Sequence, residues 1–406
     1  MSARERGLTT DEVVARTRRF IRDVVLPAEP RTGTALDPAS RRDLQRRARE
    51  AGVFAPHVPV RLGGLGLPLT EWSAVFQEAG YSPIGAAALN CMAPDEGNML
   101  LLETIADERQ QERYLAPLAA GEVRSCFAMT EPHPGAGSDP AALATVARRV
   151  PGGWVLDGEK RFISGADEAD FAIVMARTPE LGDDAATLFL VPMAAPGVEV
   201  GHPIHTLETA ITGGHPHVRF AGCRVSDDDV LGAPGEGFRH AQVRLGPARL
   251  THCMRWLGLA RRAQDTALDR VRQRELFGSR LADLGLAQGL IADSEIDLTT
   301  CSAVIDRAAR LLARDPRAGA TASSIAKVHC SEAVGRVVDR AVQLCGGDGV
   351  TLELPLVAFL NEVRPFRVYD GSSETHRWAI ARRAVARRGR EVDAGEAVLD
   401  TPEARR

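Results

Sequence analysis

The sequence predicts an α+β fold that is mostly α-helical, with an N-terminal helical domain, a central antiparallel β-barrel or β-sandwich domain and a C-terminal four-helix bundle. Three observations lead to this prediction. Aromatic residues make up only 5% of the chain, while Ala, Arg and Leu, which favour helices, are abundant. Apolar residues recur at helical spacing in the first and last thirds. In the middle third, Gly and Pro cluster and short apolar runs alternate with turn residues.

Residues 1–123 are predicted to form the N-terminal helical domain. Thr9 begins an N-cap signal, and the apolar residues that follow it recur at roughly helical spacing. Further helices are predicted at residues 38–51, 69–79 and 98–118. The Gly-rich loop of residues 61–68 follows no clear strand with the spacing of a dinucleotide fingerprint, so it does not indicate a Rossmann site.

The chain changes character at about residue 124, and residues 124–235 are predicted to form the β-domain. A short apolar run at residues 126–130 is followed by turn residues up to position 139. Runs rich in β-branched and aromatic residues then alternate with Gly and Asp turns, as in a barrel or sandwich. The predicted strands are residues 144–150, 153–156, 161–164, 171–176, 186–191, 198–201, 217–220 and the chain around Val225.

Residues 236–390 are predicted to form the bundle, because helical spacing returns there. The predicted helices are residues 239–274, 281–312, 318–344 and 378–390, with a break at 274–278. Residues 391–406 are polar and are predicted to be a frayed tail.

Composition narrows the classes of function. Lys and Arg number 50 and Asp and Glu 54, so the net charge of −4 predicts neither a nucleic-acid partner nor an anionic membrane. No apolar run approaches the length of a membrane span and the start is charged, so we expect a cytoplasmic protein. Seven scattered Cys without a Cys-x-x-Cys pair favour reduced thiols over disulfides or a zinc site, and no metal is predicted.

Asp370 is the residue on which the functional hypothesis depends. It precedes Gly371 and a Ser-Ser-Glu run, shortly before a predicted helix. Asp favours turns and helix N-caps, so one interpretation is a turn former. The other is a general base in a cleft. The motif alone favours the turn former.

Four signatures, in this order, resemble the acyl-CoA dehydrogenase family over about residues 10–390. They are Cys-Phe-Ala-Met-Thr-Glu-Pro at 126–132 with Gly-Ser-Asp at 137–139, Asp-Gly-Glu-Lys-Arg-Phe-Ile-Ser at 157–164, Arg-Glu-Leu-Phe-Gly at 274–278, and Ala-Val-Gln-Leu-Cys-Gly-Gly-Asp-Gly at 341–349 followed by Tyr-Asp-Gly-Ser-Ser-Glu at 369–374. Residues 90–99 and 244–255 resemble a narrower subgroup, which includes dehydrogenases of 4-hydroxyacyl-CoA and 4-phosphoacyl-CoA esters. That subgroup commonly carries Asp-Gly where most relatives carry Glu-Gly, and Asp370 agrees with it.

The resemblance implies that FAD is the cofactor and that an acyl-CoA thioester loses its α-proton to Asp370 and its β-hydride to flavin N5, giving a 2-enoyl-CoA. Hydrogen bonds from the Asp370 backbone N–H and a ribityl hydroxyl would stabilise the thioester carbonyl as the enolate develops. Other members place the base on the helix predicted at 239–274, where this chain has Ala248. Asp370 is one methylene shorter than Glu, so we expect the substrate or backbone to shift by roughly 1.5 Å.

The resemblance also implies which residues bind FAD. They are Phe127, Met129, Thr130, Phe162, Ser164, Arg274, Phe277, Gln343, Gly347, Ser372 and Glu374. Ordinary β-domain core is the alternative for Phe162, and capping of the next helix is the alternative for Glu374. Gln343 and Gly347 would come from another subunit, which predicts an obligate homo-oligomer, a dimer or a tetramer.

For the acyl substrate, the resemblance implies Ser138 near the pantetheine, Arg249 near the channel and Gly371 beside the base. A structural ion pair is the alternative for Arg249. The sequence departs from the family pattern at two places. The loop of residues 131–138 is longer than usual, and Gly246 stands where many relatives have an Asp that anchors pantetheine, so the CoA ester itself stays open.

Three other functions remain open. A flavin oxidase of the nitroalkane-oxidase type also uses Asp as its base, on an acidic C–H without CoA. A dehydrogenase of an acyl group bound to a carrier protein fits the altered loop. A non-catalytic flavoprotein is the third, although the carboxylate at position 370 argues against it. The electron acceptor is expected to be an electron-transfer flavoprotein or O₂.

Overall fold

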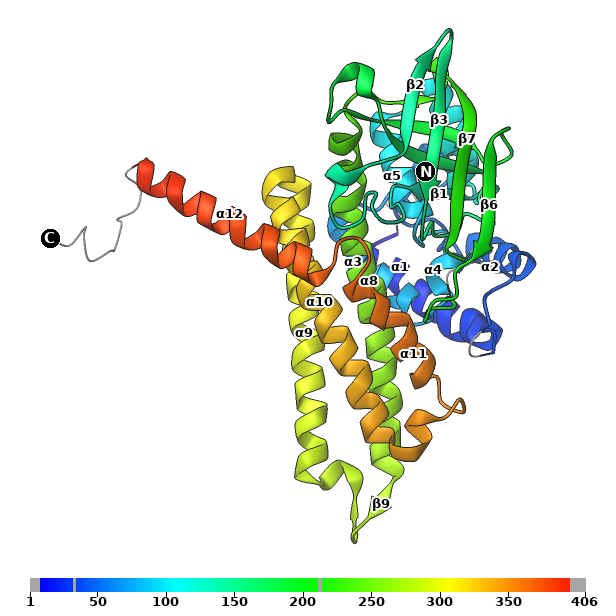
Figure 1. Ribbon diagram of the computed structural model, residues 1–406. Coiled ribbons are helices and arrows are strands. Elements are labelled where there is room, and N and C mark those ends of the chain that lie inside the picture. Colours follow the sequence, from blue (N-terminus) through cyan, green and yellow to red (C-terminus); the bar gives the residue numbers. More distant parts are fainter. Residues whose placement is uncertain (1–7, 32–33, 211–213, 395–406) are drawn as a thin grey trace, which may run out of the picture.

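The computed structural model describes residues 8–31, 34–210 and 214–394. Helices come first, a sheet follows and long helices return, which confirms the predicted order (Figure 1). The change from helix to strand lies between Ala119 and Ser125, and the change back lies between Leu231 and Gly237. Figure 1 places the sheet at one end of the long C-terminal helices.

Caps supplied by the sequence define the N-terminal helices. The Thr9 hydroxyl accepts a hydrogen bond from the Glu12 backbone N at 3.2 Å, and the Glu12 carboxylate accepts one from the Thr9 N at 2.7 Å. The prediction of one helix at 98–118 is wrong, because the chain is extended at Ala106 and Asp107 caps a new helix. The helices here are α1 (Thr10–Phe20), α2 (Pro38–Glu50), α3 (Leu69–Gly80), α4 (Gly85–Ala88), α5 (Asp95–Ile105), α6 (Glu108–Gln110) and α7 (Ala116–Ala119), with a π-helical turn at Gln111–Leu115.

One mixed sheet forms most of the β-domain, in the order β6-β7-β3-β2-β4-β5-β8. Its strands are β1 (Ser125–Ala128), β2 (Val146–Val150), β3 (Gly153–Lys160), β4 (Phe171–Arg177), β5 (Ala186–Pro192), β6 (Val198–Pro203), β7 (Pro216–Ser226) and β8 (Val230–Leu231). Most neighbours are antiparallel, but β4 pairs in parallel with β1 and, at one residue pair, with β2, so the purely antiparallel prediction is wrong. Alternate residues of β4 pack into the helical core and the β-domain core, which explains its unbroken apolar run.

The prediction of a strand at residues 161–164 is also wrong. β3 ends at Lys160, and Phe162 has a φ of 57°, a left-handed conformation that strands do not contain. The backbone here is held by two other segments. The Arg161 N donates to the Thr130 O at 2.9 Å and the Ile163 N to the Pro216 O at 3.1 Å. The segment is therefore a fixed loop beside β1 and β7.

The long C-terminal helices form a bundle with a small hairpin at its far tip, and the last helix projects away from this bundle (Figure 1). Their bounds are α8 (Gly237–Gln273), α9 (Gly285–Arg314), α10 (Pro316–Cys345), α11 (Leu356–Val363) and α12 (Ser373–Asp393), and the hairpin is β9 (Glu275–Leu276) with β10 (Ser279–Arg280). α12 begins before the predicted Trp378, because the Ser372 hydroxyl accepts a hydrogen bond from the Thr375 N at 3.2 Å. In the part of the chain that the structure describes, no helix combines the length and apolarity needed to cross a membrane.

α8 crosses α3 at two glycines. A Cβ at Gly258 would lie 2.1 Å from the Gln77 carbonyl oxygen, and a Cβ at Gly80 would lie 2.1 Å from the Arg255 carbonyl oxygen. Both distances are far below van der Waals contact, so any larger residue forces the two helices apart. Because α8 also carries Arg249 and Arg255, this crossing fixes the position of those two side chains relative to α3.

We expect Gly258→Ala to lower the free energy of unfolding by about 1–3 kcal/mol or more, because the crossing leaves no space for a methyl group. Gly335→Ala is the matched control, since a Cβ there meets no atom within 4 Å. It should raise stability by about 0.5–1 kcal/mol, as Ala does in a helix interior. Chemical denaturation of both variants measures the difference, and equal effects would contradict the close crossing.

Candidate active site

Left-handed backbone marks the predicted site. Among the described residues, the non-glycine residues with positive φ are Ala55, Asn90, Phe162, Phe277 and Asp370. Three of these five were predicted to bind cofactor or act as the base. Such conformations cost free energy and persist where surrounding contacts impose them, often at functional sites.

Three side chains from three helices hold the turn at Asp370 and Gly371. The Asp370 carbonyl accepts hydrogen bonds from Arg249 Nε at 3.1 Å and His376 Nε2 at 3.0 Å. The Gly371 carbonyl accepts one from Lys327 Nζ at 2.6 Å. Gly371 has a φ of 92°, and a Cβ there would lie 2.7 Å from His376 Nε2, so the position requires glycine. The turn is therefore fixed by the bundle rather than by its own sequence.

The Asp370 carboxylate points toward α8. Its Oδ2 lies 3.2 Å from His252 Nε2. Burial raises the pKa of Asp370, but the interaction with His252 and the charges of Arg244 and Arg249 outweigh it and hold this pKa well below its usual range. Asp370 does occupy a turn, but Ser372 caps α12, so the N-cap interpretation is wrong. An ionised carboxylate that is one-fifth exposed is able to accept a proton.

Four cations lie near Asp370. Arg244, Arg255 and Lys327 are buried and Arg249 is half-buried, and none of the four lies within salt-bridge distance of a carboxylate among the residues that the structure describes. Burial lowers the pKa of Arg249, and the ion-pair alternative for that residue is wrong, since it bonds to a carbonyl. Burial also lowers the pKa of Lys327 to about 8, against the opposing effect of Asp370. The carboxylates of Asp370, Glu96 and Asp95 offset part of this positive charge at Arg244.

His252, Lys327 and His376 were not among the predicted site residues. The partners of His252 and Lys327 lie far along the chain, so the residues around each give no sign of the contact, whereas His376 follows its partner Asp370 by six residues. One signal was available for His252. It follows Arg249 by three residues and precedes Arg255 by three, which places all of them on one face of a helix.

The predicted flavin strand lies next to this cluster. The Arg244 guanidinium lies 4.3 Å from the centre of the Phe127 ring, and its Nε donates to Asn98 Oδ1 at 2.8 Å. The bond from Arg161 N to Thr130 O brings Thr130, which is exposed, beside Phe162. Phe162 is 47% exposed, so the core alternative for it is wrong. An exposed ring and an exposed hydroxyl fit a flat aromatic group with polar edges, as in a flavin.

Ser164 belongs to a chain of polar side chains. Its Oγ lies 2.9 Å from His215 Nδ1, and His215 Nε2 lies 2.8 Å from Glu208 Oε1. Neither His215 nor Glu208 was predicted, because both lie in the Gly-rich stretch before β7. Met129 lies on the same loop as Thr130, and its carbonyl accepts a hydrogen bond from Lys160 Nζ at 3.2 Å.

The loop that carries Ser138 is built around Glu131. The Glu131 carboxylate accepts hydrogen bonds from the backbone N of Ala136, Ala144 and Thr145 and from Lys160 Nζ, at 2.6–3.0 Å. Burial raises the pKa of Glu131, but Lys160 and these donors hold it at about 2. Ser138 itself is exposed. Glu374 is also exposed in the first turn of α12 and is not the cap, since Ser372 has that role.

The residues predicted for the ADP half of FAD lie at the other end of the bundle. Phe277, in the tip hairpin, is 92% exposed. Arg249 lies roughly 36 Å along α8 from the end of that helix, which precedes Arg274. Along α10, Lys327 lies roughly 24 Å from Gln343. The structure therefore does not bring the tip residues, Gly347 included, together with Asp370 within one chain.

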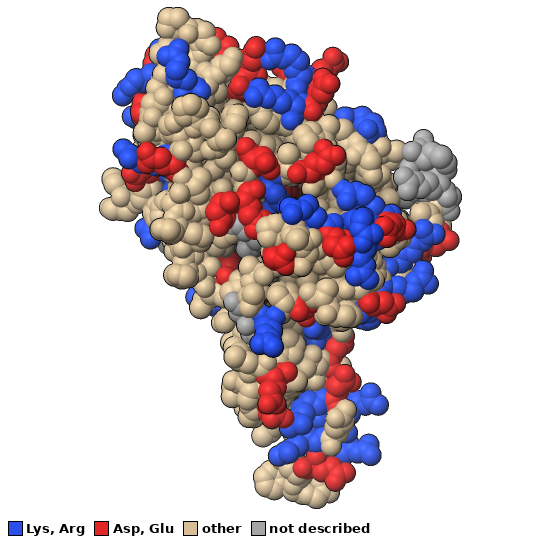
Figure 2. Space-filling view, turned by 90° about the vertical axis from the view of Figure 1, so that its right-hand side faces the viewer, with Lys and Arg blue, Asp and Glu red and all other residues tan. Residues whose placement is uncertain are grey.

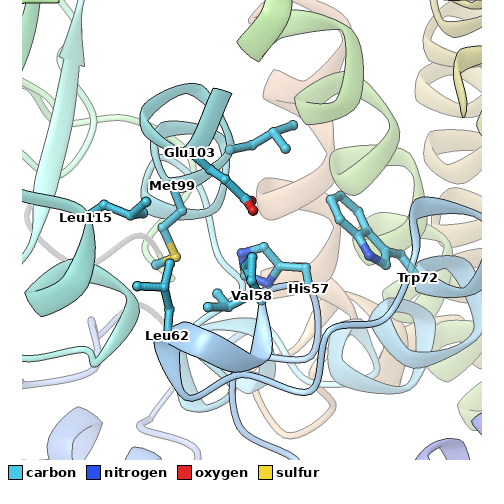
Figure 3. Close-up of a pocket in the computed structure, with 9 residues that line it drawn as sticks. His57, Val58, Leu62, Trp72, Met99, Glu103 and Leu115 are labelled. Atoms are coloured by element: carbon cyan, nitrogen blue, oxygen red, sulfur yellow. The ribbon is translucent and has the colours of Figure 1, made fainter. Parts of the chain in front are cut away.

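A separate small pocket lies in the N-terminal domain (Figure 3). His57, Trp72, Met99 and Glu103 line it among others, and Figure 3 shows the Glu103 carboxylate turned toward the imidazole. Burial lowers the pKa of His57 to about 3, so the ring is neutral. No predicted site residue lines this pocket. On the outer face in Figure 2, acidic and basic side chains are interspersed.

Comparisons with known proteins cover most of the described fold. The family models "Acyl-CoA dehydrogenase, N-terminal domain", "middle domain" and "C-terminal domain" match residues 9–122, 126–220 and 235–385. The Mycobacterium tuberculosis protein named probable acyl-CoA dehydrogenase FadE2 is 34% identical over 85% of each chain. Rattus norvegicus acyl-CoA dehydrogenase family member 11 is 32% identical over 94% of this chain and 51% of its own length.

The chain spans between about a third and a half of the length of the first curated relatives that it matches. A solved Mycobacterium abscessus structure assigned to the acyl-CoA dehydrogenases is 32% identical, with a TM-score of 0.86 and coverage of 93% of this chain and 98% of that one. The three family models, the relatives and the shared fold lead to one conclusion. The chain belongs to the acyl-CoA dehydrogenase family, a family of FAD-dependent oxidoreductases.

Proposed function

We propose that this protein catalyses the α,β-dehydrogenation of an acyl thioester with bound FAD, and that Asp370 is the base. The observation that carries the proposal is the Asp370 turn, which presents a partly exposed, ionised carboxylate among buried cations. The alternative of a non-catalytic flavoprotein gives no reason for a turn held by three side chains of separate helices.

The reaction removes two hydrogens from neighbouring carbons. The α-C–H bond breaks and its proton passes to the Asp370 carboxylate, while the electron pair forms the new double bond. FAD, when bound, accepts the hydride from the β-carbon. Phe162, Thr130 and Ser164 would lie beside the flavin.

Charge develops on the thioester oxygen as the α-proton leaves, so the site must supply donors there. The backbone N–H of Asp370 makes no hydrogen bond with the backbone of the described residues, which leaves it available for this oxygen. Arg244, Arg249 and Lys327 add positive charge nearby and would favour the enolate-like state.

Asp370→Asn should retain FAD and lower the rate of flavin reduction about 10²–10⁴-fold, because the amide cannot take the α-proton. Asp370→Glu keeps a base but moves it, and should lower the rate up to about a hundredfold. Anaerobic stopped-flow reduction of the two holoenzymes, compared with the parent, measures both. Near-normal reduction in the Asn variant would remove Asp370 from this role.

We also propose that the protein belongs to the Asp-base subgroup and that its acyl group carries a 4-hydroxyl or 4-phosphate. Four cations near Asp370, three of them buried, have no salt-bridge partner among the described residues, and they support an anionic substituent on the acyl chain. The three candidate substrates differ in the group that the site must bind beside the reacting carbons. This group is CoA in the CoA ester and a carrier protein in the carrier-protein thioester, and a nitroalkane has neither.

Among esters of one chain length, the 4-phosphoacyl-CoA should reduce the flavin fastest and the unsubstituted acyl-CoA slowest, because only the former neutralises the cations. A panel with matched carrier-protein thioesters and small nitroalkanes, read anaerobically and then with O₂ consumption, separates these substrates. The same assay shows whether O₂ or an electron-transfer flavoprotein takes the electrons. Bleaching by the nitroalkanes alone would overturn the proposed reaction.

The tip residues support a FAD site shared between subunits. Arg274, Phe277, Gln343 and Gly347 lie too far along the bundle to meet a dinucleotide that starts at Phe162 of the same chain. Exposed apolar residues on the bundle and α12, such as Leu286 and Trp378, offer surface for a second copy. We therefore propose a homo-oligomer, a dimer or a tetramer, with a cytoplasmic location.

Co-expression of an Asp370→Asn chain with an Arg274→Ala/Phe277→Ala chain should restore activity, although each variant alone is inactive. In a mixed dimer, one site receives an intact Asp370 from one chain and an intact tip from the other. Flavin reduction by the purified mixed oligomer measures this, with the two variants mixed only after purification as the control. Absence of recovery in a confirmed mixed oligomer would contradict the shared site.

A further inference from the structure

We propose that His252 is the positioning residue of the catalytic base, holding Asp370 Oδ2 with its Nε2–H so that Oδ1 takes the α-proton. This inference rests on the proposed function of Asp370. No comparison assigns a role to His252. Three sets of contacts carry the inference, and they concern the tautomer of the ring, its fixed orientation and the difference between the two carboxylate oxygens.

The tautomer follows from Arg255. Its Nη2 lies 2.9 Å from His252 Nδ1. A guanidinium has only donors, so Nδ1 must offer its lone pair and cannot carry a proton. In the neutral ring the proton is therefore on Nε2, the nitrogen 3.2 Å from Asp370 Oδ2. A doubly protonated ring would set an N–H against the Arg255 donor, so His252 serves as a donor and not as a second base.

Packing fixes the direction of that donor. His252 is 6% exposed. Its ring centre lies 4.9 Å from that of Tyr369 and 5.9 Å from that of Phe366. The Tyr369 hydroxyl in turn accepts a hydrogen bond from Trp256 Nε1 on the same helix. The ring therefore has no room to rotate away from Asp370.

The two oxygens of Asp370 differ in their surroundings. Oδ2 is buried and has no hydrogen-bond partner within the described ranges apart from the nearby imidazole. The side chain as a whole is 20% exposed, so the exposure lies away from Oδ2. The 3.2 Å contact is within hydrogen-bond distance but is not well aligned, as catalytic bonds often are not before substrate binds. Because Asp is short and an error of about 1 Å costs on the order of a hundredfold in rate, anchoring Oδ2 matters.

Several charged groups face this pair. Arg244, Arg249 and Arg255 come from α8, Lys327 from α10 and His376 from α12, and the charge of Glu208 reaches Tyr369. Burial raises the pKa of Asp370, and the interaction with His252 is the largest effect that opposes it. Loss of His252 should therefore raise that pKa. A carboxylate base works when deprotonated, so the acid limb of the rate profile should move to higher pH.

Two substitutions separate positioning from packing. His252→Gln can place its amide N where Nε2 was, because the same number of bonds separates each from Cβ. His252→Asn reaches only the Nδ1 position, so it can keep Arg255 and not Asp370. We expect the Gln variant to reduce its flavin within about fivefold of the parent, and the Asn variant about 10–100-fold more slowly with its acid limb at higher pH.

The measurement is anaerobic flavin reduction from about pH 3 to 9, a range that reaches below the usual pKa of Asp, with the panel ester that the parent oxidises fastest, on holoenzymes of equal FAD content. Equal losses in the Gln and Asn variants, or an unmoved acid limb in the Asn variant, would overturn the inference. If the Asn variant does not fold, the Gln variant decides, and a loss above tenfold in it overturns the inference. Loss of rate in Asp370→Asn with none in His252→Asn leaves the proposed function intact and rejects only the role of His252.

Discussion

The site depends on the hydrogen bonds that three helices make to two adjacent carbonyl groups. Arg249 of α8, His376 of α12 and Lys327 of α10 all bind the Asp370–Gly371 turn. A left-handed Asp costs of order 1 kcal/mol or more and needs such support. The same bonds aim the carboxylate at His252 and leave the Asp370 N–H free. The position of Asp370 therefore depends on the packing of the bundle, because any change in how α8 lies on α3 moves Arg249 and His252 together.

Burial of a cation is costly unless other charge compensates, and three of the four cations near Asp370 are buried, which we relate to the proposed reaction. They keep Asp370 ionised, which lowers its affinity for a proton and by itself makes it a weaker base. In the proposed reaction the same cations would lower the energy of an enolate, because electrostatic interactions in a partly buried site are stronger than in bulk solvent. The balance favours proton transfer only when the substrate brings negative charge to the site, either as it develops on the thioester oxygen or as a group already on the acyl chain.

Periodicity was enough to predict the order of helices, sheet and helices, because apolar spacing reports directly on buried faces. It failed where single residues override composition. Asp107 divides a long apolar segment by capping a new helix, and the left-handed Phe162 ends a run that looks like a strand. The turn at Asp370 could be found by resemblance, yet its supports could not. Arg249 meets Asp370 across 121 positions and Lys327 meets Gly371 across 44, and no local pattern marks such contacts.

The length of α8 fixes how far the Asp370 turn lies from the tip hairpin. α8 is a single helix of 37 residues that joins the base to the exposed hairpin, and its geometry fixes their separation at tens of ångströms. Phe277 adopts a left-handed conformation at that tip, and its side chain is 92% exposed. A strained, exposed aromatic residue is unfavourable in an isolated chain and becomes useful against a second copy. Under the shared site proposed above, the Asp370 turn and the tip hairpin would be two halves of one site that the fold keeps apart, and association of two chains would join them.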